Sequence, residues 1–271
     1  MLKITEPGYF LPIVHALIGG EVMQSGTNKP QFIRGVCTQT GEKADYVVKY
    51  LGAERMYTGA FAKELLAVFI ANQMGLNVPE PAKVLITKEF VETLTSNPLI
   101  HNIAGKSIGF NFGTSYIGSL RTLLKNDPMS PKQWEQLPSI FGFDMFIQNA
   151  DRDNAKPNMV SDGEKIWLFD HEMAFGFASE FPFNKTPWII RDSDMYWVSD
   201  HFFFPYLKGK DENFNTFAEN LEVLNNEFWH KIDAIIPTDW QTEEFFRIKE
   251  GLIATLAHKG EFIDQIKNRL Q

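Results

Sequence analysis

The stretch that decides the fold reads NADRDNAKPN over residues 149–158, and LFDHE follows it over residues 168–172. Apolar, strand-like residues on either side of residues 161–163 separate the two segments, which predicts a hairpin between them. Such a hairpin brings the polar loop and Asp170 to one side, where carboxylate and carboxamide oxygens suit Mg²⁺ or Mn²⁺ rather than zinc. The alternative is a solvated loop in which the Asp and Asn side chains only stabilise turns.

A lysine and a glutamate upstream complete a set of residues that phosphoryl transfer requires. In such enzymes one carboxylate orients the attacking hydroxyl, an Asn and a second Asp hold the metal, and a helical glutamate fixes a phosphate-binding lysine. Lys49 lies in the strand-like run YVVKY over residues 46–50, and Glu64 lies in the helical pattern that follows. Because these elements occur in this order along the chain, we interpret the protein as a phosphotransferase.

The wider pattern predicts an α+β fold with a β-rich first third and a helical majority. Residues 59–75 have apolar side chains at helical spacing, and Gly75 is typical of a helix end. Residues 95–118 are rich in Gly, Ser and Asn and are the least regular part, so we expect a boundary within residues 90–120. The remaining elements that we expect are an antiparallel three-stranded meander within residues 10–60, a strand over 82–86, a helix over 131–149 interrupted near Pro138, and helices near 242–256 and 261–270.

These motifs resemble those of the HipA-like kinases, which share the fold type of protein kinases and phosphatidylinositol kinases. That family has an N-D-R-H-x-x-N type catalytic loop and then a strand ending in I-D-H, to which NADRD at 149–153 and FDH at 169–171 correspond. The runs VVK at 47–49, KEL at 63–65 and MGLNVPEP at 74–81 fit the same pattern. The resemblance covers roughly residues 20–175 and implies a two-lobed, protein-kinase-like fold. We expect a β-rich N-lobe over residues 1–100 and a mainly helical C-lobe over residues 101–271.

The resemblance implies roles for four residues. Asp151 is expected to be the catalytic base, and Asp170 is expected to bind Mg²⁺ or Mn²⁺. Lys49 is expected to contact the phosphates of ATP, and Glu64 is expected to pair with Lys49.

The loop between the first two strands is expected to cover the ATP phosphates. It spans residues 25–29 and contains Ser25, Gly26 and Thr27, followed by Asn28 and Lys29. Because it has a single glycine, a plain β-turn is the alternative interpretation.

Two departures from the family pattern leave the assignments open. Asp153 stands where the family has histidine, and Lys156 stands where it has its metal-binding Asn, five residues after Asp151. Either Asp151 or Asp153 is therefore the base, and either Asn154 or Asn158 is the metal ligand. A lysine at the ligand position also keeps open a nucleotide-binding pseudokinase that acts as an interaction module.

Composition limits the partners and the location. The 271 residues include 26 Lys and Arg against 34 Asp and Glu, a formal charge of −8, which argues against bulk nucleic-acid binding. No run of 18 apolar residues occurs, so we expect no membrane span. Cys37 is the one cysteine, which excludes an internal disulfide and favours a reducing, cytoplasmic location.

The resemblance implies a protein acceptor with a Ser or Thr hydroxyl, and it allows an antitoxin-like regulator of the toxin–antitoxin type. A small-molecule kinase, which shares the lobes and the Asp pair, is a further alternative.

Overall fold

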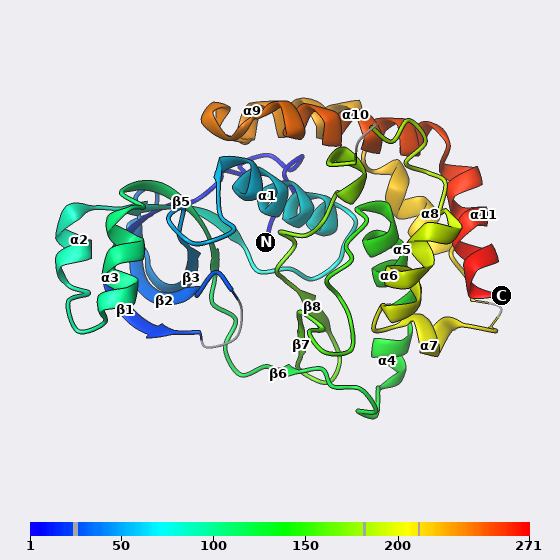
Figure 1. Ribbon diagram of the computed structural model, residues 1–271, viewed down its shortest axis with the longest axis horizontal. Helices are drawn as coiled ribbons and strands as arrows, with labels where there is room; N and C mark the ends of the chain where they lie inside the picture. Colours follow the sequence, from blue (N-terminus) through cyan, green and yellow to red (C-terminus); the bar gives the residue numbers. More distant parts are fainter. Residues whose placement is uncertain (24–26, 181–182, 211) are drawn as a thin grey trace.

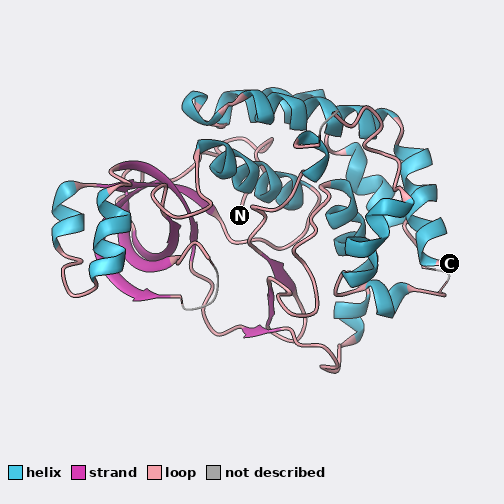
Figure 2. Ribbon diagram, viewed as in Figure 1, coloured by secondary structure: helices cyan, strands magenta, loops and turns pink. Residues whose placement is uncertain are grey.

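The computed structural model describes residues 1–23, 27–180, 183–210 and 212–271. Its fold mixes helices with two sheets, as the sequence predicts, and the larger sheet forms a ring at one side of the molecule (Figure 2). This sheet is a closed barrel with the strand order β1-β2-β3-β5-β4. Its strands are β1 (Ile13–Val22), β2 (Gln31–Cys37), β3 (Lys43–Lys49), β4 (Pro81–Ile86) and β5 (Gly109–Ser115).

The barrel consists of the predicted three-stranded meander and two further strands, β4 and β5. Strands β1, β2 and β3 pair in antiparallel order, which confirms the meander. Strand β4 pairs parallel to β1 and antiparallel to β5, and β5 pairs with β3, so the sheet closes on itself. The closure was not predicted, because it depends on β5, which lies in the stretch that reads as least regular.

Strand β5 carries residues that seldom form strands. A Cβ atom at Gly113 would lie 2.6 Å from Cγ2 of Val84 and 3.0 Å from the carbonyl oxygen of Val47, so glycine allows the two flanking strands to approach. Asn111 is fully buried, and its side chain accepts a hydrogen bond from the backbone N–H of Leu51 at 2.8 Å and donates one to the carbonyl of Ser107 at 2.7 Å. Close packing and buried hydrogen bonds therefore outweigh the weak strand propensity.

Helix α1 (Thr58–Gln73) is the long helix that the sequence predicts. It is buried on most of its surface and lies between the barrel and the helices on the other side of the molecule (Figure 1). Gly75 follows it with φ +81°, a backbone conformation that glycine adopts without strain.

The segment after the barrel contains a second, three-stranded sheet in the order β6-β7-β8. Strands β7 (Met159–Ser161) and β8 (Ile166–Leu168) form the predicted hairpin, and β6 (Arg121–Thr122) pairs with β7. The helix expected over 131–149 is divided into α4 (Pro131–Trp134) and α5 (Leu137–Phe146), with Pro138 in the first turn of α5.

The other helices are short, apart from the two long ones at the C-terminal end. Helices α10 (Glu243–Ala257) and α11 (Lys259–Leu270) correspond to the two that the sequence predicts. The rest are α2 (Lys88–Glu92), α3 (Pro98–Gly105), α6 (Met195–Asp200), α7 (Phe204–Leu207), α8 (Asn215–Glu222), α9 (Asn226–Ile235) and the 3₁₀ turns Gly176–Ala178, Asp192–Asp194 and Thr238–Trp240.

No helix within the described part of the chain combines the length and the apolar character that crossing a membrane requires.

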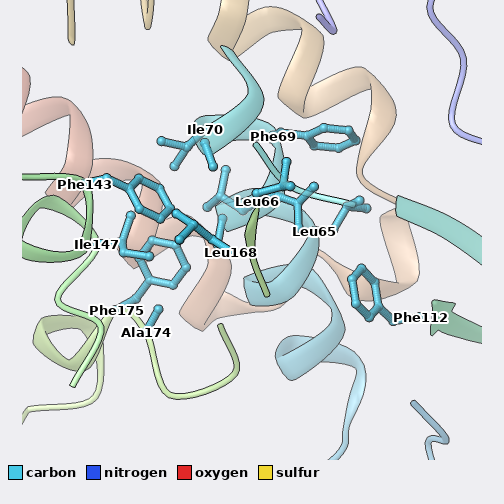
Figure 3. Packing of buried hydrophobic residues seen from close by; sticks show 14 of the residues in the cluster. Leu65, Leu66, Phe69, Ile70, Phe112, Phe143, Ile147, Leu168, Ala174 and Phe175 are labelled. Carbon is cyan, nitrogen blue, oxygen red and sulfur yellow. The ribbon is translucent and has the colours of Figure 1, made fainter. Parts of the chain in front are cut away.

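Apolar packing around α1 joins the barrel to the helical part. Figure 3 shows Leu65, Leu66, Phe69 and Ile70 of α1 between Phe112 of β5 on one side and a group from the helical side on the other. That group is Phe143, Ile147, Leu168, Ala174 and Phe175. All of these residues belong to one continuous buried cluster, so α1 holds the end of β3 and the segment after β8 in fixed positions.

Ile70→Ala should lower the free energy of unfolding by about 2–5 kcal/mol, because it removes a fully buried side chain and leaves a cavity. The matched control is Ile253→Ala on α10, where the side chain is 42% exposed and the cost should be well below that of Ile70→Ala. Urea unfolding of the two variants measures the difference. Equal destabilisation would contradict the central position of α1 in the core.

Candidate functional site

Lys49 is the last residue of β3, and its ammonium group lies among three carboxylates from two other segments. Nζ contacts the carboxylate of Glu64 on α1, lies 2.6 Å from Oδ1 of Asp170 and lies 3.5 Å from Oε2 of Glu172. The last two residues follow β8. Three segments distant in the sequence therefore meet at one buried positive charge.

The electrostatics of this cluster favour the charged forms of Lys49 and Asp170, whereas burial raises the pKa of Glu64. Burial acts to lower the pKa of Lys49, but Glu64, Asp170 and Glu172 raise it above its ordinary value. Burial likewise opposes ionisation of Asp170, yet the Lys49 and Lys156 ammonium groups hold the pKa of Asp170 well below its usual range. Lys49 is therefore a fixed cation rather than a proton carrier.

The polar loop over residues 149–158 contributes a second charged contact beside the first. Nζ of Lys156 lies 2.9 Å from Oδ2 of Asp151 and 3.0 Å from Oδ2 of Asp170. The side-chain amide of Asn158 donates to the backbone carbonyl of Asp151 at 3.0 Å and to its Oδ2 at 3.2 Å. Asp151, Asp170 and Asn158 are thus brought together, as the sequence predicts.

A buried ionic network under the loop fixes its backbone. Asp144 of α5 accepts hydrogen bonds from Nε of Arg152 at 2.6 Å and from the side-chain amide of Asn149 at 3.0 Å, and its Oδ2 lies 3.0 Å from Nε2 of His201. Arg152 in turn donates to the carbonyl of Asn158 at 2.8 Å. Burial opposes ionisation of Asp144, but Arg152 and His201 hold the pKa of its carboxyl well below its usual range.

Asp153 and Asn154 are the remaining candidates for the base and the metal ligand. Oδ1 of Asp153 accepts the backbone N–H groups of Ala155 and Lys156, each at 2.7 Å, so this carboxylate stabilises the turn. Asn154 is exposed, and no hydrogen bond joins it to the cluster among the described residues.

Two of the candidate site residues have backbones in the left-handed region, with φ of 49° at Asn158 and 60° at Asp170. Asn and Asp tolerate this conformation better than other non-glycine residues, and such conformations concentrate at functional sites.

The loop after β1 reaches the cluster through Asn28, one of the loop residues that are expected from the sequence to cover the phosphates. Thr27 is exposed in a turn, whereas the neighbouring Asn28 is buried and its side chain donates to Glu172. Asn28 also accepts the backbone N–H of Arg55 at 3.0 Å. The predicted loop residues Ser25 and Gly26 lie outside the described residues.

The carboxylates offer the ligand chemistry of a divalent metal. One oxygen each from Glu64, Asp170 and Glu172 lie within 4.8 Å of one another, and carboxylate oxygens suit Mg²⁺ and Mn²⁺. Lys49 contacts the same three carboxylates, so an ion bound here has to share them with an ammonium group. The donor set fits a metal held mainly by Asp170, because its side chain is the most exposed of the three carboxylates.

Glu172, the contact of Asn28 with it and the bridging contact of Lys156 are the parts of the cluster that were not predicted from the sequence; Asn28 itself was expected only as part of the loop over residues 25–29. Glu172 stands two residues after Asp170 in the same polar stretch, which was an available indication. The contacts of Asn28 and Lys156 depend on how the chain folds back, and no local pattern indicates them.

Comparisons with known proteins identify a family and a similar solved structure. The sequence profile described as "HipA-like kinase" matches residues 21–256, a range that contains every residue of the cluster. No curated protein matches the sequence at a significant level. Among solved structures, the crystal structure of a Helicobacter pylori proinflammatory kinase, CtkA, matches with 13% identity and a TM-score of 0.47, covering 93% of this chain and 96% of that chain.

Asp144→Asn should lower the free energy of unfolding by about 3–5 kcal/mol at neutral pH, because it leaves the buried Arg152 guanidinium without a carboxylate. The pKa of Asp144 is lower in the folded than in the unfolded chain, so its contribution is present above about pH 4 and is lost as the pH falls further. Urea unfolding at pH 7 and near pH 3 measures both effects.

Asp264→Asn, an exposed site on α11, is the control and should behave like the wild type at both pH values. Equal stability of the wild type and Asp144→Asn at pH 7 would contradict the anchoring role of Asp144.

Proposed function

The chain belongs to the HipA-like kinase family, as its motifs predict, and we propose that it is an ATP- and Mg²⁺-dependent kinase that phosphorylates a hydroxyl group. The observation that carries the proposal is the convergence on Lys49. Glu64 and Asp170 come from two separate segments to its ammonium group, and Asp170 is joined through Lys156 to Asp151. A structural ion pair needs one carboxylate, whereas this arrangement supplies the separate groups that phosphoryl transfer uses.

Each residue has a task in the proposed reaction. Lys49, held by Glu64, binds phosphate oxygens of ATP. Asp170 and Asn158 are the ligands for Mg²⁺, which when bound neutralises charge on the phosphates. Asp151 orients the acceptor hydroxyl and takes its proton. The hydroxyl oxygen forms a bond to the γ-phosphorus, the bond from that phosphorus to the β–γ bridging oxygen breaks, and ADP leaves.

We assign the base to Asp151 rather than Asp153 because of their hydrogen bonds. Asp151 faces Lys156, which also contacts Asp170. Asp153 already accepts two backbone N–H groups. The side-chain contact of Asn158 with Asp151 likewise favours Asn158 over the exposed Asn154 as the metal ligand.

We also propose a two-lobed arrangement with ATP between the lobes. The barrel would be the core of the N-lobe, and because β5 belongs to the barrel, this lobe would end near residue 116 rather than at residue 100. The helical remainder, with the hairpin β7–β8, would be the C-lobe.

For the acceptor we propose a Ser or Thr hydroxyl of a protein, and for regulation an antitoxin-like partner, both by analogy with the family. A small-molecule acceptor is the alternative. The readout that separates the two is the chemical nature of the labelled product.

A second candidate function rests on Lys156. This residue stands at the family's metal-ligand position and contacts both Asp151 and Asp170. A nucleotide-binding pseudokinase would bind ATP but would not transfer phosphate.

Asp151→Asn should lower phosphate transfer from γ-labelled ATP by about 10²–10⁴-fold, because it removes the proton acceptor, while ATP binding persists. Asp153→Asn is the matched comparison and should keep most of the activity, because an amide oxygen can still accept the two backbone N–H groups. Label transfer to the chain itself or to lysate proteins is the measurement.

Loss of activity only in Asp153→Asn would move the base to Asp153. ATP binding by the wild type without any transfer would favour the pseudokinase.

A further inference from the structure

Lys156 lies where a cation bridging the two catalytic carboxylates would lie. Its Nζ is 2.9 Å from Asp151 and 3.0 Å from Asp170, so one positive charge joins the loop carboxylate to the carboxylate after β8. The side chain of Lys156 is 40% exposed, and its ammonium group contacts both carboxylates at once.

The two oxygens of Asp170 are divided between two lysines. Oδ1 lies 2.6 Å from Nζ of Lys49, and Oδ2 lies 3.0 Å from Nζ of Lys156. A divalent ion that bridged Asp151 and Asp170 would need the space that the Lys156 ammonium fills, since Mg²⁺ binds carboxylate oxygens at about 2.0–2.1 Å.

Lysine at this position cannot serve as a metal ligand. A protonated ammonium group has three donors and no lone pair to offer an ion. The neighbouring Asn158 donates its amide hydrogens to Asp151, so its side-chain oxygen is the atom of this amide that can bind an ion. Asp170 and Asn158 provide ligands for one ion. The place between Asp151 and Asp170, where a second ion could bind, is filled by the ammonium group of Lys156.

On the basis of the proposed function, we propose that Lys156 replaces one divalent cation, so that this kinase binds a single Mg²⁺ or Mn²⁺ together with ATP. Lys156 then supplies, beside Asp151, the positive charge that a second ion would bring to the phosphates. The lysine that replaces the family's Asn at residue 156 then changes the number of bound metal ions and does not abolish the active site.

The test counts the Mn²⁺ ions bound per molecule of a non-hydrolysable ATP analogue, by equilibrium dialysis with paramagnetic resonance detection of free Mn²⁺. The wild type should bind one ion per bound nucleotide. Lys156→Asn should bind two, because it restores an oxygen ligand and removes the competing charge.

Two further variants act as controls. Lys156→Met removes the charge without adding a ligand and should stay at one ion, and Lys125→Asn, at an exposed lysine outside the cluster, should also stay at one. Thermal unfolding of each variant checks that it is folded. If Lys156→Asn does not fold, the wild-type count alone decides.

Two ions in the wild type, or one ion in a folded Lys156→Asn, would overturn this inference and leave the proposed kinase function standing. Failure of the wild type to bind the nucleotide would overturn the proposed function, and this inference with it.

Discussion

The buried contact of the Lys49 ammonium with Glu64 and Asp170 is the interaction on which the rest of the arrangement depends. It joins the end of a barrel strand, the central helix and the segment after the β7–β8 hairpin. With Glu172 nearby, three carboxylates lie around the ammonium groups of Lys49 and Lys156, so the carboxylates outnumber the cations in this largely buried place. Buried charges contribute little net stability, and an unbalanced set is unfavourable. The apolar packing around α1 therefore has to hold this cluster together, and the unbalanced charge suits the binding of a further cation.

Asp144 fixes the loop over residues 149–158, just as the packing of α1 fixes the position of Lys49. Its hydrogen bonds to Arg152, Asn149 and His201 hold the loop backbone that carries Asp151 and Asn158. Lys156 then links Asp151 to Asp170. Buried groups such as Asp144 and Arg152 thus fix the partly exposed charges of Asp151 and Lys156. Preorganised electrostatic sites generally have this construction.

Local patterns predicted much of this. The apolar alternation of β1–β3, the helical spacing of α1 and the hairpin before Asp170 all follow from residues close together in the sequence. The roles of Lys49, Glu64, Asp151 and Asp170 are implied by the resemblance to the HipA-like kinases and stay predictions. Strand β5 and the barrel closure could not be predicted, because Gly113 and Asn111 favour a strand only through close packing and buried hydrogen bonds with distant segments. The contact of Asn28 with Glu172 could not be predicted either, because it joins residues far apart in the chain.

The central claim is that the Lys49 cluster is the binding site for nucleotide phosphates. Calorimetric titration of the intact chain with ATP and Mg²⁺ tests it most directly, with Lys49→Met beside Lys43→Met, an exposed lysine on the same strand. We expect saturable binding by the wild type and by Lys43→Met, and at least about tenfold weaker binding by folded Lys49→Met, which lacks the charged contact with the phosphates. Unchanged affinity in folded Lys49→Met, or no binding by the wild type, would contradict the claim.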